Sequence, residues 1–146
     1  VNKRRTTLEL GEAYDFIETG VKPELQDYMN GQVLNELEYC LNLYDLEPKV
    51  YIAYDRLAYF EKGNDDLRIS FDTNIRTRRS DLLLESGDHG KRLLDSDVWL
   101  MEIKTSLAKP LWLCEMLSEF EIRSSSFSKY GTEYKNMMAR QKEMPK

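Results

Sequence analysis

The fold is decided by residues 49–79, which read KVYIAYDRLAYFEKGNDDLRISFDTNIRTRR. Two segments rich in valine, isoleucine, tyrosine and phenylalanine flank residues 61–66, which include glycine, asparagine and aspartate. This pattern predicts a β-hairpin with a loop of medium length. In the second segment Leu67, Ile69 and Phe71 alternate with polar residues, so we expect one apolar face and one charged face.

The charged face of this hairpin is rich in arginine. Arg56 ends a largely apolar row in the first segment, where it needs a partner or must extend to solvent. In the second segment Arg76 and Arg78 share the face of Arg68 if the strand is unbroken. Five arginines lie between positions 56 and 79, more than the few nearby acidic residues would pair. Either water or a polyanion could satisfy such a face.

Composition favours one soluble domain over residues 1–146, with a modest core. The sixteen aromatic residues need burial, which argues against long disordered stretches. No apolar run reaches the length of a membrane span, and we expect no signal peptide and a cytoplasmic location. The net charge of −5 argues against a general nucleic-acid binder.

The cysteines and the single histidine suggest no catalytic or zinc site. Cys40 and Cys114 lie on the apolar sides of predicted helices and are interpreted as buried free thiols of a reducing compartment. His89 lies in a predicted turn, residues 86–90. We find no zinc-ligand spacing and no Ser-His-Asp or Cys-His arrangement.

Outside the hairpin, the periodicities predict a mixed α+β chain. We expect strands over residues 1–8 and 98–104, a possible short strand at 82–84, and helices over 11–19, 23–44, 109–120 and 132–146. The first helix should bury a stripe of apolar residues, Leu10, Ala13, Tyr14 and Ile17, and end at Gly20. Gly31 weakens the second helix, so a break there is an open alternative.

The strand predicted over residues 98–104 separates apolar from charged side chains. Trp99, Met101 and Ile103 share one face, while Glu102 and Lys104 share the other. A cross-strand salt bridge, worth little if exposed, is the simplest interpretation of the charged pair. We also expect Arg56, Arg68, Glu102 and Lys104 to project from one surface. The residues expected to pack against helices on the other face are Leu67, Ile69, Phe71, Trp99 and Ile103.

Five short motifs together resemble one protein family. In chain order they are Lys3-Arg4-Arg5, Tyr54-Asp55-Arg56, residues 67–73 (LRISFDT), Met101-Glu102-Ile103-Lys104 and Phe127-Ser128-Lys129-Tyr130. Their order and spacing are similar to the polyphosphate polymerase domain of the vacuolar transporter chaperone (VTC) family, in its soluble bacterial form. That family belongs to the CYTH-like triphosphate tunnel metalloenzymes. The resemblance extends from Lys3 to about Tyr134.

The resemblance implies a tunnel of antiparallel strands with flanking helices. The family's domain normally begins further upstream, with additional strands. We therefore expect this chain to hold the C-terminal portion of the domain and an incomplete tunnel. Exposed strand edges would then be available for self-association.

The resemblance also implies roles for individual residues. Phosphate-binding roles fall on Lys3, Arg5, Arg56, Arg68, Lys104 and Lys129, and catalytic roles on Arg56, Arg68 and Lys104. Glu102 matches the ligand of a divalent metal, Mn²⁺ or Mg²⁺. These residue types suit phosphoryl transfer, which depends on positioning and charge neutralisation and uses arginine forks, lysine charges and a hard cation.

The implied function is ATP-dependent polymerisation of polyphosphate, by transfer of the γ-phosphoryl group of ATP to a growing chain. A triphosphate or polyphosphate hydrolase and a non-catalytic polyphosphate-binding module are the alternatives on the same tunnel. Charges that are merely solvated would be a non-functional explanation. The resemblance leaves open whether this chain is an active phosphotransferase by itself, and it assigns no role to Arg76, Arg78, Arg79 or His89.

Overall fold

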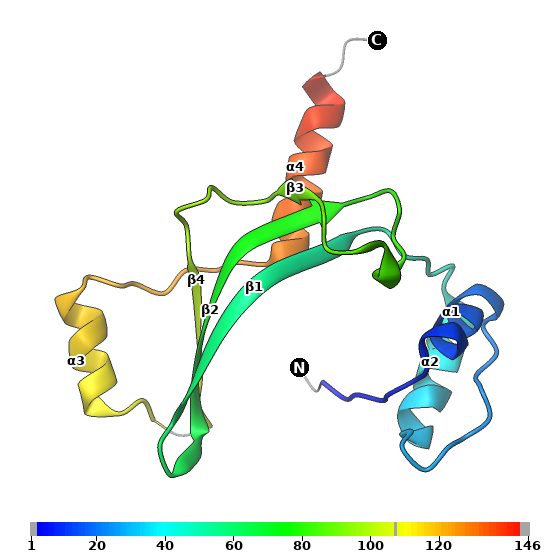
Figure 1. Cartoon of the computed structure of the whole chain (residues 1–146), viewed down its shortest axis with the longest axis horizontal. Coiled ribbons are helices and arrows are strands. Elements are labelled where there is room, and N and C mark those ends of the chain that lie inside the picture. The colour runs from blue at the N-terminus through cyan, green and yellow to red at the C-terminus, as the bar shows by residue number, and fades with distance from the viewer. Residues whose placement is uncertain (1–2, 107, 144–146) are drawn as a thin grey trace. The chain divides into compact units, whose positions relative to one another are not determined.

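The computed structural model describes residues 3–106 and 108–143, and it divides the chain into two compact units, Val1–Pro48 and Lys49–Lys146. The first unit contains helices α1 (Leu10–Thr19) and α2 (Gly31–Leu43). The second contains a four-stranded antiparallel sheet and helices α3 (Leu111–Glu119) and α4 (Lys129–Glu143) (Figure 1). The mixed α+β class is therefore confirmed.

The first unit is organised around one aromatic side chain. Phe16 of α1, 2% exposed, forms a buried cluster with Met29 and with Leu34 of α2. The predicted stripe on α1 was wrong, since Ile17 is 41% exposed. The buried side of α1 centres on Phe16 instead, because Phe16 packs against Met29, in the segment before α2, and against Leu34 of α2. The predicted end of α1 at Gly20 is confirmed, with φ of 69° in the left-handed region that favours glycine.

One predicted element of this unit does not form, and another is shorter than predicted. Residues 3–9 have no regular secondary structure, so the strand predicted over residues 1–8 was wrong for the described positions; residues 1–2 lie outside them. A strand requires a ladder partner, and no described segment supplies one. Residues 23–30 are not helical either, and α2 begins at Gly31, at the position of the suspected break. The Asn30 side chain accepts a hydrogen bond from Val33 N at 3.2 Å and so caps α2.

The sheet of the second unit is built on the predicted hairpin. Strands β1 (Tyr51–Glu61) and β2 (Asn64–Arg78) pair along their length, and β2 also pairs with β3 (Lys91–Arg92) and β4 (Leu100–Lys104). The loop is shorter than predicted, because Glu61 pairs with Asn64. Gly63 provides the positive φ, 79°, that so tight a turn needs. The four strands form an open sheet, and the closed tunnel stays a prediction.

A β-bulge divides β2 into two halves. Asp55 lies opposite Thr73, but Ala53 lies opposite Arg76, so β2 holds one extra residue between these pairs. Asn74 has a φ of 48°, in the left-handed region. The extra residue reverses the side on which later side chains project, so Arg76 and Arg78 lie on the face opposite Arg68. The prediction that all three share a face was wrong because the strand is not regular.

The apolar face of the sheet meets α3, as predicted for Ile69 and Phe71. These residues and Met101 line an apolar cavity of about 240 Å³ together with α3 side chains, among them Leu113, which is 4% exposed. Trp99 was wrongly placed in this set of packed residues. It precedes β4 and is 51% exposed.

Arg78 holds the loop that follows β2. Residues 82–84 do not form the short strand considered above; a 3₁₀ turn covers Leu84–Ser86. The guanidinium of Arg78 donates hydrogen bonds to the backbone oxygens of Asp81, Leu83, Gly87 and His89 at 2.6–3.0 Å. These bonds require the loop to curl around Arg78, which prevents an extended conformation.

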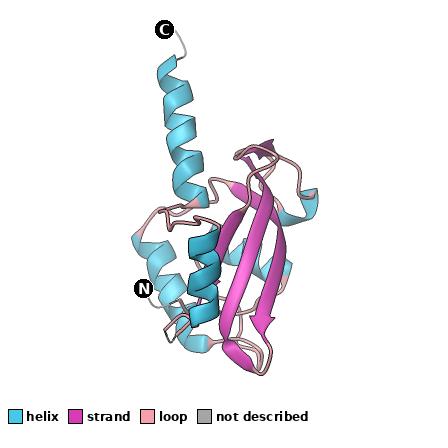
Figure 2. Ribbon diagram, turned by 90° about the vertical axis from the view of Figure 1, so that its left-hand side faces the viewer, coloured by secondary structure: helices cyan, strands magenta, loops and turns pink. Residues whose placement is uncertain are grey.

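The remaining predicted features agree in part. Both cysteines are free, as predicted, but Cys40 is only half-buried and Cys114 is exposed. Helix α4 begins three residues before the predicted start at residue 132 and extends beyond the end of the sheet (Figure 2). Within the described residues, no helix combines the length and apolar character needed to cross a membrane.

The bulge at Asn74 predicts a specific pattern of stability. Asn74→Val should lower the free energy of unfolding by about 1–2 kcal/mol, because a β-branched residue is strained at positive φ. Asn74→Gly loses the same side-chain hydrogen bond to Asp55 but tolerates the backbone, so it should remain within about 0.5 kcal/mol of the wild type. Urea denaturation measures both. Equal stability of the valine and glycine variants would contradict a left-handed bulge.

Candidate functional site

Strand pairing gathers the predicted site residues of the sheet on one face. Arg56 lies opposite Asp72, Arg68 opposite Lys104, and Ser70 opposite Glu102. Residues directly opposite in a ladder project to the same side. The four side chains predicted to share a surface therefore do so. We call this surface the basic face and define it by Arg56, Arg68, Asp72, Glu102, Lys104 and Lys129.

A buried carboxylate lies at the centre of the basic face. Asp72 is 1% exposed and accepts hydrogen bonds from Nε and Nη2 of Arg56 at 2.5 and 2.7 Å. It also accepts one from Nζ of Lys129 at 2.6 Å, which ties α4 to the sheet. Burial by itself raises the pKa of the Asp72 carboxyl, but the hydrogen bonds from Arg56 and Lys129 outweigh it and leave this pKa below its ordinary value.

Tyr54 contributes an aromatic surface to the same pair of cations. Its ring centroid lies 4.8 Å from Cζ of Arg56 and 4.4 Å from Nζ of Lys129. Both distances are in the range of cation–π attraction. Neither Tyr54 nor Asp72 was predicted as a site residue. The signal for Asp72 was present, since an acid alternating with apolar residues in a strand must find a cation when it is buried.

Glu102 lies among cations, as predicted. Its carboxylate is 3.1 Å from Nζ of Lys104 and 3.9 Å from Nη2 of Arg56, and its side chain is 44% exposed. Glu102 and Lys104 both belong to β4, so this ion pair lies within one strand and is not the cross-strand salt bridge considered as the simplest interpretation. An exposed pair of this kind contributes little stability, so Glu102 remains available to a stronger cation.

Arg68 differs from the other cations of the basic face. Its guanidinium lies over the ring of Phe60, with Cζ 5.3 Å from the ring centroid. Its Nε is buried without a hydrogen-bond acceptor in the described part of the chain. A buried donor left unsatisfied costs roughly 1–3 kcal/mol. Four cations face two carboxylates on this surface, so an anion bound at Arg68 would meet an excess of positive charge.

The other hairpin arginines are paired, which corrects the expectation that acids would be too few. Arg76 contacts Asp55 at 3.1 Å and also pairs with Asp88. Arg79 donates two hydrogen bonds to Glu133 of α4 at 2.8 and 2.6 Å. The acids that pair with them include residues far along the chain, which a count within the hairpin misses. These arginines, like Arg78, hold loops and α4 in place.

Lys3 and Arg5 lie in the first unit, where both are exposed. Arg5 lines a cavity of about 380 Å³ with residues on either side of Met29. Their role beside the basic face stays a prediction. The predicted metal ion also stays a prediction: residues 3–106 and 108–143 contain no group of three or more histidine, cysteine, aspartate or glutamate side chains placed to hold an ion.

Comparison with known proteins gives the family. A sheet face with excess arginine and lysine, and with an unsatisfied arginine Nε, suits phosphate-rich anions. Residues 1–138 match the family model described as the VTC domain, and the chain belongs to this family. The family inferred from the motifs is therefore confirmed, and it relates the chain to polyphosphate, while the bacterial form and the tunnel-metalloenzyme superfamily stay predictions. No curated protein matches the sequence significantly.

The buried carboxylate predicts a dependence of stability on pH. Because its pKa is lowered in the folded state, Asp72 contributes its full stabilisation above its unfolded-state pKa of about 3.9 and loses it as pH falls further. Asp72→Asn should destabilise the protein by about 3 kcal/mol at pH 7, because two partly buried cations, Arg56 and Lys129, lose their counter-ion. The difference from wild type should shrink below about pH 4. Chemical denaturation across this pH range measures it.

Asp88→Asn is the matched control for Asp72→Asn. Asp88 also pairs with an arginine, but its side chain is 72% exposed. Its replacement should change stability by less than about 1 kcal/mol. If both variants lost the same stability, or if the Asp72 effect were independent of pH, the central role of Asp72 would be wrong.

Proposed function

We propose that this protein is an ATP-dependent polyphosphate polymerase whose basic face forms one wall of a phosphate-binding tunnel. The observation that carries the proposal is the buried, unsatisfied Nε of Arg68, in a chain of the VTC-domain family in which Arg68, Glu102 and Lys104 share one face. A phosphate oxygen is an acceptor suited to this guanidinium, because arginine donates parallel hydrogen bonds to it.

The residues of the basic face divide into two groups. Arg56 and Lys129 are already bound to Asp72, which holds them in position. The three side chains together carry a net charge of one rather than two. Arg68 and Lys104 lie side by side across β2 and β4, and neither contacts Asp72. We assign Arg68 and Lys104 to the phosphates that react, and Arg56 and Lys129 to the neighbouring phosphates of the chain.

Glu102 suits a divalent cation only in part. It offers one carboxylate, which Mg²⁺ accepts when phosphate oxygens complete the coordination. Asp72 is a poor second ligand, because it is buried and already accepts three hydrogen bonds from Arg56 and Lys129. A bound Mn²⁺ or Mg²⁺ would neutralise charge on the phosphates as they react. The carboxylate of Glu102 would then turn from Lys104 to the metal, which leaves Lys104 free to bind phosphate.

The reaction requires no covalent participation by the protein. A terminal oxygen of the chain forms a bond to the γ-phosphorus of ATP. The bond from that phosphorus to the bridging oxygen breaks, and ADP leaves with the electron pair. The chain has then grown by one phosphoryl unit. The protein aligns the two anions and offsets their repulsion, which is the main requirement of phosphoryl transfer.

Binding by Arg68 is the first test of the proposal. Arg68→Met keeps the aliphatic stem over Phe60 but removes the charge, so the affinity for tripolyphosphate should fall about tenfold or more. The wild-type affinity should decrease as salt is raised, because the contacts are ionic. Isothermal titration calorimetry at two salt concentrations measures both effects.

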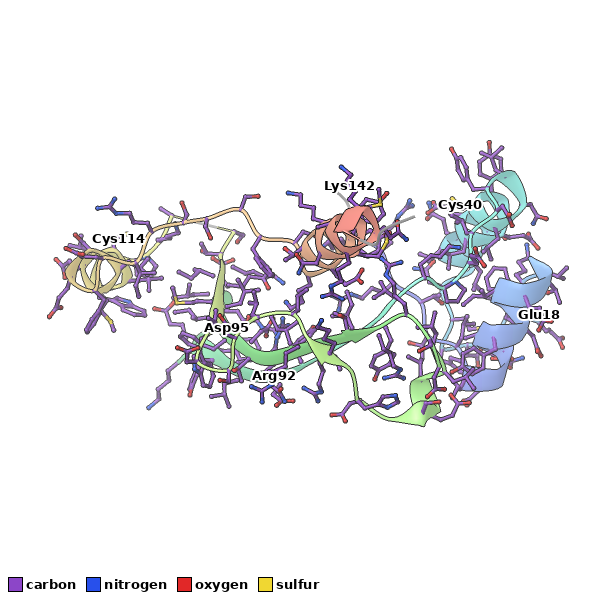
Figure 3. The ribbon with its side chains drawn as sticks, turned by 90° about the horizontal axis from the view of Figure 1, so that it is seen from above. Glu18, Cys40, Arg92, Asp95, Cys114 and Lys142 are labelled. Atoms are coloured by element: carbon purple, nitrogen blue, oxygen red, sulfur yellow. The ribbon has the colours of Figure 1, made fainter. Side chains whose placement is uncertain are left out.

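Arg92→Met is the control for Arg68→Met. Arg92 is exposed and lies opposite Arg76 in the ladder, so it projects from the other face of the sheet. Figure 3 labels Arg92 on the side of the strands away from α4. Equal losses of affinity in the two variants would show that net charge, rather than the basic face, determines binding.

Turnover depends on Glu102 in this proposal. Glu102→Gln should bind tripolyphosphate at least as tightly as wild type but lose most production of ADP from ATP with Mn²⁺, because the charge that holds the metal is removed. Chain growth accompanying ADP release distinguishes a polymerase from a hydrolase. Release of free phosphate without chain growth would identify a hydrolase, and binding without turnover would identify a binding module.

A further inference from the structure

A second group of cations lines a groove beyond the basic face. The groove has a volume of about 380 Å³ and lies between the end of β2 and α4. We call it the distal groove. Its charged lining residues are Arg78, Arg79, Lys91, Glu133 and Arg140.

The distal groove lies on the same side of the sheet as the basic face. Thr77, which lines the groove, is paired with Ile52, and Ile52 shares the face of Arg56 by alternation along β1. Lys91 lies directly opposite Thr77 and therefore projects to this side too. The bulge at Asn74 is what turns Thr77, rather than Arg76, to this side.

Helix α4 connects the two cationic regions. Lys129, Glu133, Met137 and Arg140 recur at intervals of four, four and three residues, which places them along one side of the helix. Lys129 binds Asp72 on the basic face, and Glu133 binds Arg79 at the end of β2. Met137 and Arg140 continue this side into the distal groove.

Two cations of the distal groove, Lys91 and Arg140, have no counter-ion within the described residues. The guanidinium of Arg79 is bound to Glu133, and that of Arg78 is bound to backbone oxygens. Lys91 and Arg140 are exposed, and their side chains form no ion pair or hydrogen bond within the described residues. Both line the same concave surface, where an anion could meet them together.

We propose that the distal groove is a second binding site for inorganic polyphosphate, which holds a stretch of the chain away from the reacting phosphates. This inference rests on the proposed function and adds to it a preference for long polyphosphate chains over short ones. Arg68 and Thr77 are nine residues apart in β2, which corresponds to roughly 30 Å of strand. A triphosphate occupies one region only, whereas a long chain spans both.

Binding measurements with two ligands test this proposal. The double variant Lys91→Ala/Arg140→Ala should lose about tenfold or more in affinity for long-chain polyphosphate, because two ionic contacts are removed. Its affinity for tripolyphosphate, which is set by the basic face, should be unchanged. The control is Arg92→Ala/Lys135→Ala, which removes the same charge from the opposite sheet face and from an exposed position of α4. Circular dichroism checks that each variant keeps its helix content.

The outcomes separate this inference from the proposed function. If the double variant and its control bind long chains equally well, the distal groove is not a site, while loss of binding in Arg68→Met still supports the basic face. If the double variant loses long-chain binding but Arg68→Met does not, the distal groove stands and the assignment of the basic face fails. If wild type binds polyphosphate of neither length, both proposals are wrong.

Discussion

The interaction between Asp72 and its two cations is the constraint on which the second unit depends. The carboxylate is buried in the middle of β2, where an unpaired charge would be prohibitively unfavourable. Arg56 supplies a bidentate partner from β1, and Lys129 supplies a second from α4, 57 residues along the chain. One residue thereby fixes the register of the hairpin and the position of a distant helix. The cations that hold the fold together, Arg56 and Lys129, therefore lie on the same face as Arg68 and Lys104, which we assign to the reacting phosphates.

This arrangement explains why the polar side of the sheet is also buried. Ser70 and Asp72 are among the least exposed residues of the chain, although they alternate with the apolar residues that meet α3. Burial keeps water from the Asp72 carboxylate, so its contacts with Arg56 and Lys129 are stronger than they would be on an open surface, whereas Glu102 and Lys104 remain exposed. Arg68 is affected by burial in another way, since its Nε is buried and lacks an acceptor in the described residues. Stability and anion affinity are therefore set by different residues of one surface.

Much of the second unit could be predicted from sequence because its strands follow simple alternation. The hairpin, the shared face of Arg68 and Glu102, and the packing of Ile69 and Phe71 all come from period-two spacing. Long-range partners could not be predicted in this way: Glu133 is 54 residues from Arg79 and becomes its neighbour only in the folded chain. The segment before α2 was wrongly predicted as helix. The Asn30 side chain caps the helix by accepting a hydrogen bond from Val33 N, and apolar periodicity carries no information about such a cap. Family motifs identified the basic positions but not Asp72, whose importance comes from burial.

The bulge at Asn74 shifts the alternation of side chains along β2 by one residue. Residues before it and after it follow alternation, but the two alternations are out of phase by one position. The strand can thus direct Arg68 to one side of the sheet and Arg76 and Arg78 to the other, with each set serving a separate purpose. A deletion of one residue here would exchange the two sides along the rest of the strand, so the loop anchored by Arg78 would lose its support while the composition stayed nearly the same. The two faces of this hairpin therefore depend on its length as well as on its residue types.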